Sequence, residues 1–176
     1  MGLVKMVESA KSVRLMIFDV DGVMTDGSLY YTDTGEEVKA FNSLDGHGLK
    51  MLRASGVRLA IITGRTSALV ANRAAHLGID YLHQGAHDKL AVFEQLLQEA
   101  GVSAAECGYM GDDVVDLPVM RRVGFAVAVP ESPELVLQAS HYVTGRGGGC
   151  GAVRELCEYL LQAQGNWERV MAPYLR

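Results

Sequence analysis

The chain has 176 residues, of which 49% are apolar and 21% charged, and its formal net charge is −5. This length and apolar content suit one domain, residues 1–176, with a substantial core, and they exclude a disordered chain. An acidic chain without a block of lysine and arginine is not expected to bind nucleic acid, and no apolar run approaches the roughly 20 residues of a membrane span.

The N-terminal segment and the cysteines indicate where the protein works. No apolar stretch leads to a small-residue cleavage site near the N-terminus, so no secretory signal is predicted. Cys107, Cys150 and Cys157 are an odd number without a C-x-x-C spacing, which favours free thiols over a disulfide framework or a zinc site. Reduced thiols are typical of the cytoplasm, which is the location we expect.

Apolar runs of strand length alternate with helical patterns along the chain. Runs with little polar alternation predict strands buried on both faces, as in a parallel sheet; they span residues 13–20, 57–62, 79–82, 107–110 and 124–129. Helical patterns cover residues 44–54, 66–77, 87–100, 113–122, 133–139 and 152–163. This order predicts an α/β fold, a Rossmann-like doubly wound parallel sheet whose strand ends share one edge.

Two segments interrupt the alternation. Residues 28–41 have β-rich ends around Asp33-Thr34-Gly35, which predicts a β-hairpin inserted after the first strand. Residues 145–151, with the sequence GRGGGCG, are too rich in glycine for regular structure and predict a flexible or tightly turning loop.

Residues with chemical potential follow the predicted strands. Asp19 and Asp21 end the first apolar run, and burying both carboxylates is costly unless they meet a cation or are put to use. Thr63 follows the second run, just before Gly64-Arg65. A hydroxyl and a free backbone N–H there suit phosphate oxygens, although threonine is also an ordinary helix N-cap.

A lysine and a second acidic cluster complete the set. Lys89 opens a predicted helix, where its charge opposes the helix dipole, so we expect it to serve an anion; taken singly, it could equally be a solvated lysine. Asp112, Asp113 and Asp116 follow the run that ends at Met110. Acids from two strand ends are what Mg²⁺ needs, because Mg²⁺ prefers oxygen ligands and keeps several waters.

The order of these motifs resembles the haloacid-dehalogenase superfamily of phosphatases. DVDGVMTD at 19–26, a threonine after an apolar strand, a lysine and GDDVVD at 111–116 occur in sequence and span most of the chain. The resemblance implies that Asp19 attacks phosphorus and becomes an aspartyl phosphate. Asp21 would act as the acid and then the base, and Thr63 and Lys89 would hold the phosphoryl oxygens.

The same resemblance implies a Mg²⁺ cofactor. Its ligands would be the Asp19 carboxylate, the backbone carbonyl of Asp21 and the Asp112 carboxylate. Asp113 and Asp116 would orient these groups from behind.

Three further segments resemble a narrower branch of the superfamily. FNSLDGHGLK at 41–50, GGGCG at 147–151 and AQGN at 163–166 match enzymes that act on the 8-phosphate of an eight-carbon sugar acid, a precursor of the inner sugar of lipopolysaccharide. Arg65 and Arg73 lie eight apart on one predicted helix, so both can face the same way, and arginine suits a carboxylate. The residues implied for binding this small phosphorylated sugar acid are Asn42, Ser43, Leu44, Asp45, Gly46, Lys50, Arg65 and Arg73.

A covering domain is not expected. The segments between Asp26 and Thr63 and between Thr63 and Lys89 have room only for the hairpin, two helices and a short strand. The resemblance therefore implies a capless enzyme that assembles as a homotetramer, in which hairpins pack together and a neighbouring subunit covers each site. Tyr30, Tyr31 and Val38 would then lie at the interface, or else pack on their own core. The glycine loop and residues 167–176 form either a lid or a frayed terminus.

Three other functions stay open at this point. A nine-carbon, sialic-acid-type sugar 9-phosphate is an alternative substrate. A phospho-accepting receiver domain also uses Asp, Thr and Lys around Mg²⁺, but it places its acidic pair before the acceptor and has no acid two residues beyond it. A catalytically idle scaffold subunit would not need the complete motif set.

Overall fold

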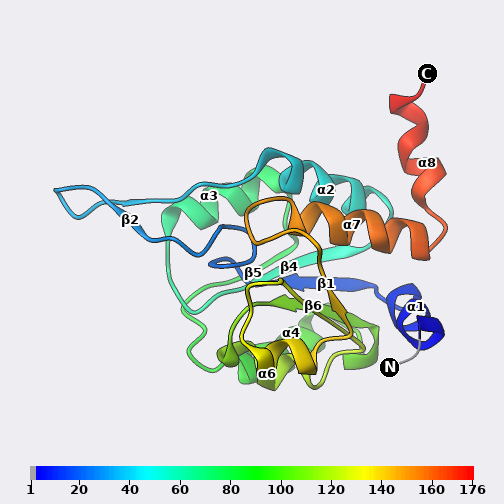
Figure 1. Cartoon of the computed structure of the whole chain (residues 1–176), viewed down its shortest axis with the longest axis horizontal. Helices are drawn as coiled ribbons and strands as arrows, with labels where there is room; N and C mark the ends of the chain where they lie inside the picture. The colour runs from blue at the N-terminus through cyan, green and yellow to red at the C-terminus, as the bar shows by residue number, and fades with distance from the viewer. Residues whose placement is uncertain (1–2) are drawn as a thin grey trace.

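The computed structural model describes residues 3–176, with side chains from residue 6 onward. Its main sheet has six strands in the order β5-β4-β1-β6-β7-β8, all parallel, with helices on both faces (Figure 1). The strands are β1 (Leu15–Phe18), β4 (Arg58–Ile62), β5 (Tyr81–His83), β6 (Cys107–Gly111), β7 (Phe125–Ala128) and β8 (Tyr142–Val143). The Rossmann-like doubly wound sheet expected from the apolar runs is therefore confirmed.

The helices divide between the two faces of the sheet. Those on one face are α2 (Ser43–Ala54), α3 (Ala68–Leu77) and α7 (Ala152–Ala163), and those on the other include α4 (Lys89–Ala100) and α6 (Glu134–Ala139) (Figure 1). The remaining helical elements are α1 (Leu3–Lys11), η1 (Ala104–Glu106), η2 (Val114–Asp116), α5 (Leu117–Met120), α8 (Trp167–Met171) and η3 (Ala172–Tyr174). No described helix is long and apolar enough to span a membrane.

The central strand β1 shows why the apolar runs lack alternation. Met16 and Phe18 pack into the hydrophobic cluster on the α2 and α7 side, whereas Leu15 and Ile17 pack into the cluster on the α4 side. All four side chains are fully buried. Since both faces of a parallel sheet are covered, each position along the strand must be apolar.

The register of the sheet brings three strand ends together. Phe18 in β1 is aligned with Ile61 in β4 on one side and Met110 in β6 on the other. The backbone N–H of Asp19 also donates to the carbonyl of Met110 at 3.0 Å. Residues that follow β1, β4 and β6 therefore meet at the middle of one edge, where the order of strands reverses and ligands of such folds bind.

A two-stranded hairpin projects from this edge of the sheet (Figure 1). It consists of β2 (Tyr30–Tyr31) and β3 (Glu37–Val38), paired antiparallel, and Gly35 turns the chain with φ of 83°. Within residues 3–176, only this hairpin and α2 lie as elements between β1 and β4. The predicted hairpin and the absence of a cap in the described chain are both confirmed.

Several helix starts differ from the predicted ones because capping decides them. The side chain of Asn42, rather than Ser43, accepts the free N–H groups at the start of α2, and Asp88 does the same for α4. Helix α3 begins only after Ser67, so Arg65 precedes it. The predicted helix over 113–122 splits into η2 and α5, because Asp113 closes a capping box on η2.

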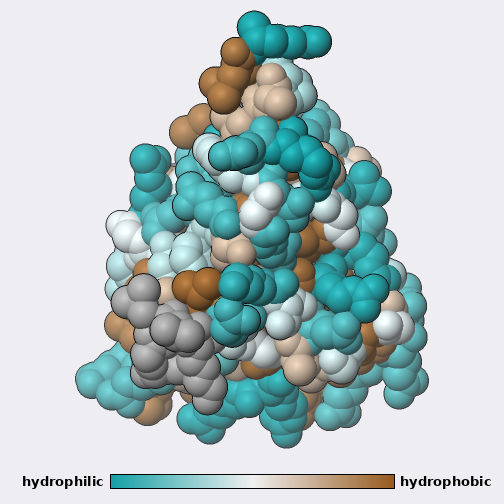
Figure 2. Space-filling model, turned by 90° about the vertical axis from the view of Figure 1, so that its right-hand side faces the viewer, coloured by the Kyte–Doolittle hydropathy of each residue, from teal (hydrophilic) through white to brown (hydrophobic). Residues whose placement is uncertain are grey.

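Elements α1, β8 and α8 were not predicted from the sequence. α1 packs along α7. The side chain of Gln164, just after the end of α7, donates to the carbonyls of Ala10 in α1 and of Val13 beyond it. Figure 2 looks at the end of the molecule with α1 and the C-terminal segment, a mostly hydrophilic face from which that segment stands out. The short strand β8 and the short helix α8 depend on similar contacts between distant segments, and local sequence patterns do not reveal such contacts.

Candidate active site

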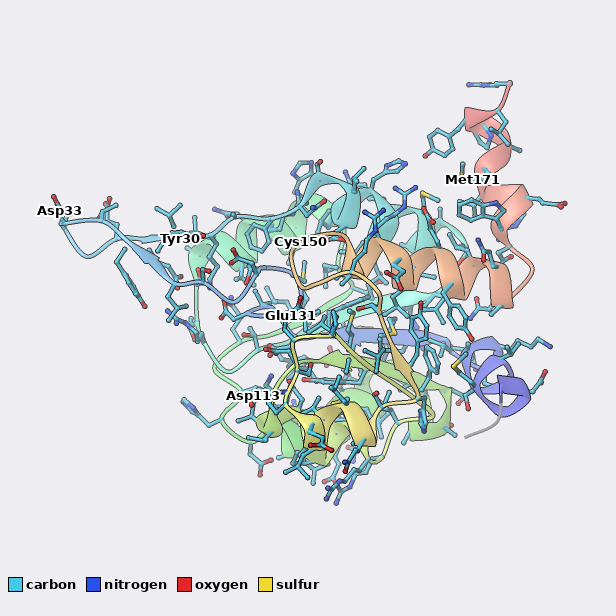
Figure 3. All side chains as sticks on the ribbon, in the orientation of Figure 1. Tyr30, Asp33, Asp113, Glu131, Cys150 and Met171 are labelled. Carbon is cyan, nitrogen blue, oxygen red and sulfur yellow. The ribbon has the colours of Figure 1, made fainter. Side chains whose placement is uncertain are left out.

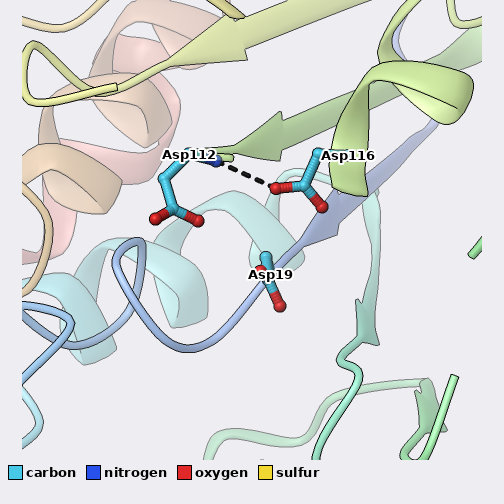
Figure 4. Close-up of side chains that lie close together, drawn as sticks. All are labelled: Asp19, Asp112 and Asp116. Carbon is cyan, nitrogen blue, oxygen red and sulfur yellow. Dashed lines mark hydrogen bonds between the residues drawn. The ribbon is translucent and has the colours of Figure 1, made fainter. Parts of the chain in front are cut away.

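Three carboxylates meet at the edge defined by β1 and β6. Asp19 follows β1, Asp112 follows β6 and Asp116 ends η2, and one oxygen from each lies within 4.8 Å of the others (Figure 4). Asp19 is 6% exposed and Asp116 fully buried. Three acids this close need a compensating cation, since like charges in a poorly solvated site disfavour ionisation.

Lys89 supplies part of that compensation. Its buried ammonium lies 2.9 Å from Oδ2 of Asp19 and 2.7 Å from Oδ1 of Asp116. Burial lowers the pKa of Lys89, but the charges of Asp19 and Asp116 outweigh burial and hold that pKa above its ordinary value. The lysine is therefore charged, and its position at the first turn of α4 is explained by the acids it faces.

The acids still carry more negative charge than one lysine balances. Burial, together with the charge of Asp116, raises the pKa of Asp19 to about 6. Burial and the charges of Asp19 and Asp116 raise the pKa of Asp112 to about 7. A hard divalent cation bound by oxygen ligands would remove this excess, so the donor set fits such an ion.

Asp116 orients the cluster, and both oxygens of its carboxylate accept hydrogen bonds from neighbouring groups. Its Oδ1 accepts from Lys89 and from the buried hydroxyl of Tyr109, at 2.7 and 2.6 Å. Its Oδ2 accepts from the backbone N–H groups of Asp112 and Asp113, at 3.0 and 3.2 Å. Four hydrogen bonds occupy the lone pairs of this group. Tyr109 was not among the predicted site residues, because a tyrosine within an apolar run is indistinguishable from core.

Asp113 does not join the carboxylate cluster. Its side chain is exposed and accepts from the N–H of Val114 at 2.7 Å, at the start of η2. Figure 3 shows it near the same end of the sheet as Cys150 and Glu131, with Met171 at the other end. The side chain of Asp113 also accepts from the backbone N–H of Asp116 in a capping box, and its own backbone N–H donates to the Asp116 carboxylate. Asp113 therefore caps the turn that carries Asp116, and its role in orienting the cluster stays a prediction.

The Asp21 carboxylate lies toward the hairpin. Its Oδ1 accepts a hydrogen bond from the ammonium of Lys39, and its Oδ2 is 3.9 Å from Nε of Arg65. Lys39 and its neighbour Glu37 were not predicted as site residues. A single lysine in a polar hairpin has no local signature that separates it from a solvated surface residue.

Thr63 is buried and follows β4 directly, beside β1. Its backbone N–H donates to the carbonyl of His83, and its own carbonyl accepts from Ala86, both at 3.0 Å. These two bonds fix the turn that leads toward Lys89. The structure thus holds Thr63 rigidly at the predicted strand end.

The glycine-rich loop packs directly on the turn after Asp19. Gly22 adopts φ of 89° beside Asp112, and a Cβ at Gly148 would overlap the carbonyl oxygen of Gly22. The N–H of Gly149 donates to the carbonyl of Val23 at 3.0 Å. Glu155 in α7 accepts from two backbone N–H groups at the base of the loop. These contacts hold residues 145–149 against the site.

We expect the Gly148→Ala substitution to test this packing. The added methyl group meets backbone, which cannot rotate away, so the cost should be about 1 to 3 kcal/mol of unfolding free energy together with reduced activity. Gly145→Ala is the matched control, because the nearest atoms to its Cβ lie at 3.7 Å or more. Urea unfolding of both variants measures the difference, and equal stabilities would contradict the packing.

The residues predicted to bind the sugar acid separate into two groups. Asn42 donates from Nδ2 to the carbonyl of Gly149 at 3.2 Å, and Arg73 donates to the carbonyl of Asn42 at 3.1 Å. Gly46 leaves the space that the Arg73 guanidinium occupies. Arg65 lies with the hairpin instead, so the expectation that Arg65 and Arg73 share a helix is wrong: the helix begins three residues after Arg65.

The other predicted binding residues differ in exposure. Asp45 is buried, and its Oδ1 accepts from the N–H of Arg154 at 2.8 Å in the first turn of α7. That bond ties α2 to α7. Lys50 and Ser43 line, with Arg73, a pocket of about 240 Å³ between α2 and α3, and Leu44 is 52% exposed.

Comparison with known proteins identifies the class. Residues 36–124 match the family model of the haloacid dehalogenase-like hydrolases, and the chain belongs to this family of hydrolases. It is 46% identical to the 3-deoxy-D-manno-octulosonate 8-phosphate phosphatase KdsC of Escherichia coli (strain K12), over 90% of this chain and 85% of that one.

Solved structures agree with this relationship. The 3-deoxy-D-manno-octulosonate 8-phosphate phosphatase of Moraxella catarrhalis, in complex with magnesium, phosphate and KDO, is 43% identical and superposes with a TM-score of 0.96, covering 98% of this chain and 99% of that one. The cobalt-bound phosphatase of Haemophilus influenzae is 38% identical, with a TM-score of 0.90 and coverage of 96% and 99%.

Proposed function

We propose that this protein hydrolyses 3-deoxy-D-manno-octulosonate 8-phosphate to the free sugar acid and inorganic phosphate. The observation that carries the proposal is the cluster of Asp19, Asp112 and Asp116 around Lys89 at the carboxyl edge of β1 and β6. The three relatives reported above, between 38% and 46% identical to this chain, are each named as phosphatases of this substrate.

We assign the role of nucleophile to Asp19. The N–H of Val20 donates to its Oδ1 at 2.7 Å, and Lys89 faces its Oδ2, so the orientation of the carboxylate is fixed. It is ionised when cations balance the charge of the acidic cluster. In the proposed first step an Asp19 oxygen forms a bond to phosphorus while the bond from phosphorus to the sugar oxygen breaks. The product is an aspartyl phosphate.

Asp21 serves both proton transfers. It protonates the departing sugar oxygen, and it then takes a proton from the water that attacks the aspartyl phosphate. Thr63 and Lys89 hold the phosphoryl oxygens meanwhile, Thr63 through its hydroxyl and Lys89 through its charge.

Mg²⁺ fits the acidic edge as the cofactor. The carboxylates of Asp19 and Asp112 and the backbone carbonyl of Asp21 would hold it, with Asp116 fixing Asp112 and Lys89 in place. When bound, the ion neutralises charge on the phosphoryl group and on the acids.

Stabilisation of the protein by Mg²⁺ should grow with pH. The pKa values of Asp19, about 6, and Asp112, about 7, lie above their ordinary value of 3.8. The folded metal-free protein therefore binds protons more tightly than the unfolded chain, and its stability falls as pH rises through this range. A cation competes with those protons. The rise in melting temperature on adding Mg²⁺ should be larger at about pH 8 than at about pH 5.5, and equal rises would contradict this.

The sugar acid is proposed to lie toward the two basic groups described above. Arg73 and Lys50 line the pocket between α2 and α3, and Arg65 lies beside the hairpin, near Asp21 and Glu37. A guanidinium offers two parallel N–H donors to a carboxylate. The carboxylate of the substrate is therefore assigned to this basic surface.

Release of inorganic phosphate from the eight-carbon 8-phosphate tests the function directly. We expect turnover that needs added Mg²⁺ and stops with a chelator, and a nine-carbon sugar 9-phosphate should give a lower kcat/KM. No phosphate release from the eight-carbon substrate under any of these conditions would overturn the proposal.

The assembly, pathway and location are proposed on the same basis. A homotetramer would cover the open site, and the exposed Tyr30, Tyr31 and Val38 on the hairpin offer apolar surface for it; sedimentation of the purified protein measures the oligomeric state.

The product would enter lipopolysaccharide synthesis. A cytoplasmic location is supported by the odd cysteine count, and one domain over residues 1–176 by two core clusters that share a single sheet.

A further inference from the structure

We propose that Lys39 is a positioning residue for Asp21, acting from the base of the hairpin; this inference rests on the phosphatase function proposed above. Lys39 follows β3 directly, and its ammonium donates to Oδ1 of Asp21. Its side chain is only 2% exposed. The hairpin therefore reaches the residue to which the proton transfers are assigned, through a charged group withdrawn from solvent.

The contact is part of a closed network of charges. Glu37 Oε1 lies 3.4 Å from Nζ of Lys39 and 2.6 Å from Nη2 of Arg65. Arg65 in turn lies 3.9 Å from Asp21 and donates to the hydroxyl of Tyr31 at 3.0 Å. Two cations and two carboxylates balance one another, so the network can persist in a partly buried place.

Among the residues whose side chains the structure describes, Lys39 and Arg65 are the ones that form ionic contacts with Asp21. Asp19 is held by Val20 and Lys89, and Asp116 by four hydrogen bonds, whereas the ionic contacts of the Asp21 carboxylate come from Lys39 and Arg65. A group that must deliver and later take a proton gains most from a fixed orientation. Burying the Lys39 ammonium costs free energy unless the charge is paired, and the turn of the hairpin does not require this burial. The pairing with Asp21 and Glu37 offsets that cost.

The test uses two substrates that differ in their need for an acid. The sugar oxygen leaves only with a proton, whereas nitrophenolate leaves p-nitrophenyl phosphate without one. Hydrolysis of the aspartyl phosphate needs Asp21 in both cases. In Lys39→Met we expect kcat for the sugar 8-phosphate to fall about 100-fold, with KM changed less than about threefold.

The aryl phosphate gives the more specific signature. Phosphoryl transfer from p-nitrophenyl phosphate to Asp19 needs no acid. The Lys39→Met variant should therefore release a rapid burst of nitrophenolate, stoichiometric with active sites, followed by slow turnover. The wild type should show no such burst. Lys39→Arg, which keeps the charge, should restore kcat to within about tenfold of wild type. Glu36→Gln, an exposed change in the same hairpin, is the control and should leave both reactions unchanged.

The outcomes separate the alternatives. Equal losses on both substrates without a burst would make Lys39 a structural residue only, and a raised KM with unchanged kcat would make it a substrate contact; either overturns the proposal, as does no change. Lys39→Gln, which keeps a hydrogen-bond donor, replaces Lys39→Met if the latter does not fold. If wild-type protein releases no phosphate from the sugar substrate, the proposed function fails, while the burst with the aryl phosphate still decides the role of Lys39.

Discussion

Asp19→Asn is expected to lower turnover of the sugar 8-phosphate by at least roughly 10⁴-fold, because the amide cannot form the covalent intermediate. The side chain keeps its size, so the Val20 N–H can still donate to it and the fold should be retained. Steady-state phosphate release, measured on protein shown to be free of wild type, checks the result.

The matched control for this substitution is Asp33→Asn at the exposed tip of the hairpin (Figure 3). It makes the same chemical change far from the carboxylate cluster and should leave kcat unchanged. Appreciable turnover by Asp19→Asn in a verified pure sample would refute Asp19 as the nucleophile, whatever the control shows.

Lys89→Met should cost the metal-free protein about 3 to 5 kcal/mol of unfolding free energy, as expected when one partner of a buried ionic network is removed. Asp19 and Asp116 would then face each other without the ammonium that now lies within 2.9 Å of both. Turnover should fall at least about 100-fold, since the phosphoryl group loses a cation as well. Urea unfolding with and without Mg²⁺ measures the stability.

Mg²⁺ should recover part of the stability lost by Lys89→Met, because a bound divalent cation balances the same acids. Lys11→Met is the control: Lys11 pairs with Glu8 at an exposed position of α1, and such pairs contribute about 0.5 kcal/mol. If Lys89→Met were as stable as the control without Mg²⁺, the charge balance described for the site would be wrong.

The sheet and its catalytic edge were predictable from the sequence for a physical reason. A strand covered on both faces must be apolar at each position, as Leu15 to Phe18 are, and chains leave such strands at a common edge. Asp19 follows β1, Asp112 and Asp116 follow β6, and Lys89 follows β5, so the common edge brings these four residues to the same site. Local order and topology were sufficient for that prediction.

The remaining parts of the site depend on contacts between distant segments. Arg65 sits outside α3 because the side chain of Gln84, well along the chain, accepts from the N–H of Ser67 at the helix start. Asp45 caps α7 through Arg154, and Lys39 reaches Asp21 across the hairpin. Neither spacing nor composition identifies these partners in the sequence. The sequence therefore indicates which residues belong to the site but not which residues they contact.

The central place of β1 bears on how the protein is made. Leu15 to Phe18 emerge early from the ribosome, yet their neighbours in β4 and β6 come much later, the last pairing joining Phe18 to Met110. Until β4 is made, the fully apolar strand β1 has two open edges, and until β6 is made it still has one, a condition that favours slow folding and aggregation. Nascent chains stalled before β6 should therefore depend on chaperones, and fragments ending there should have no assembled catalytic centre.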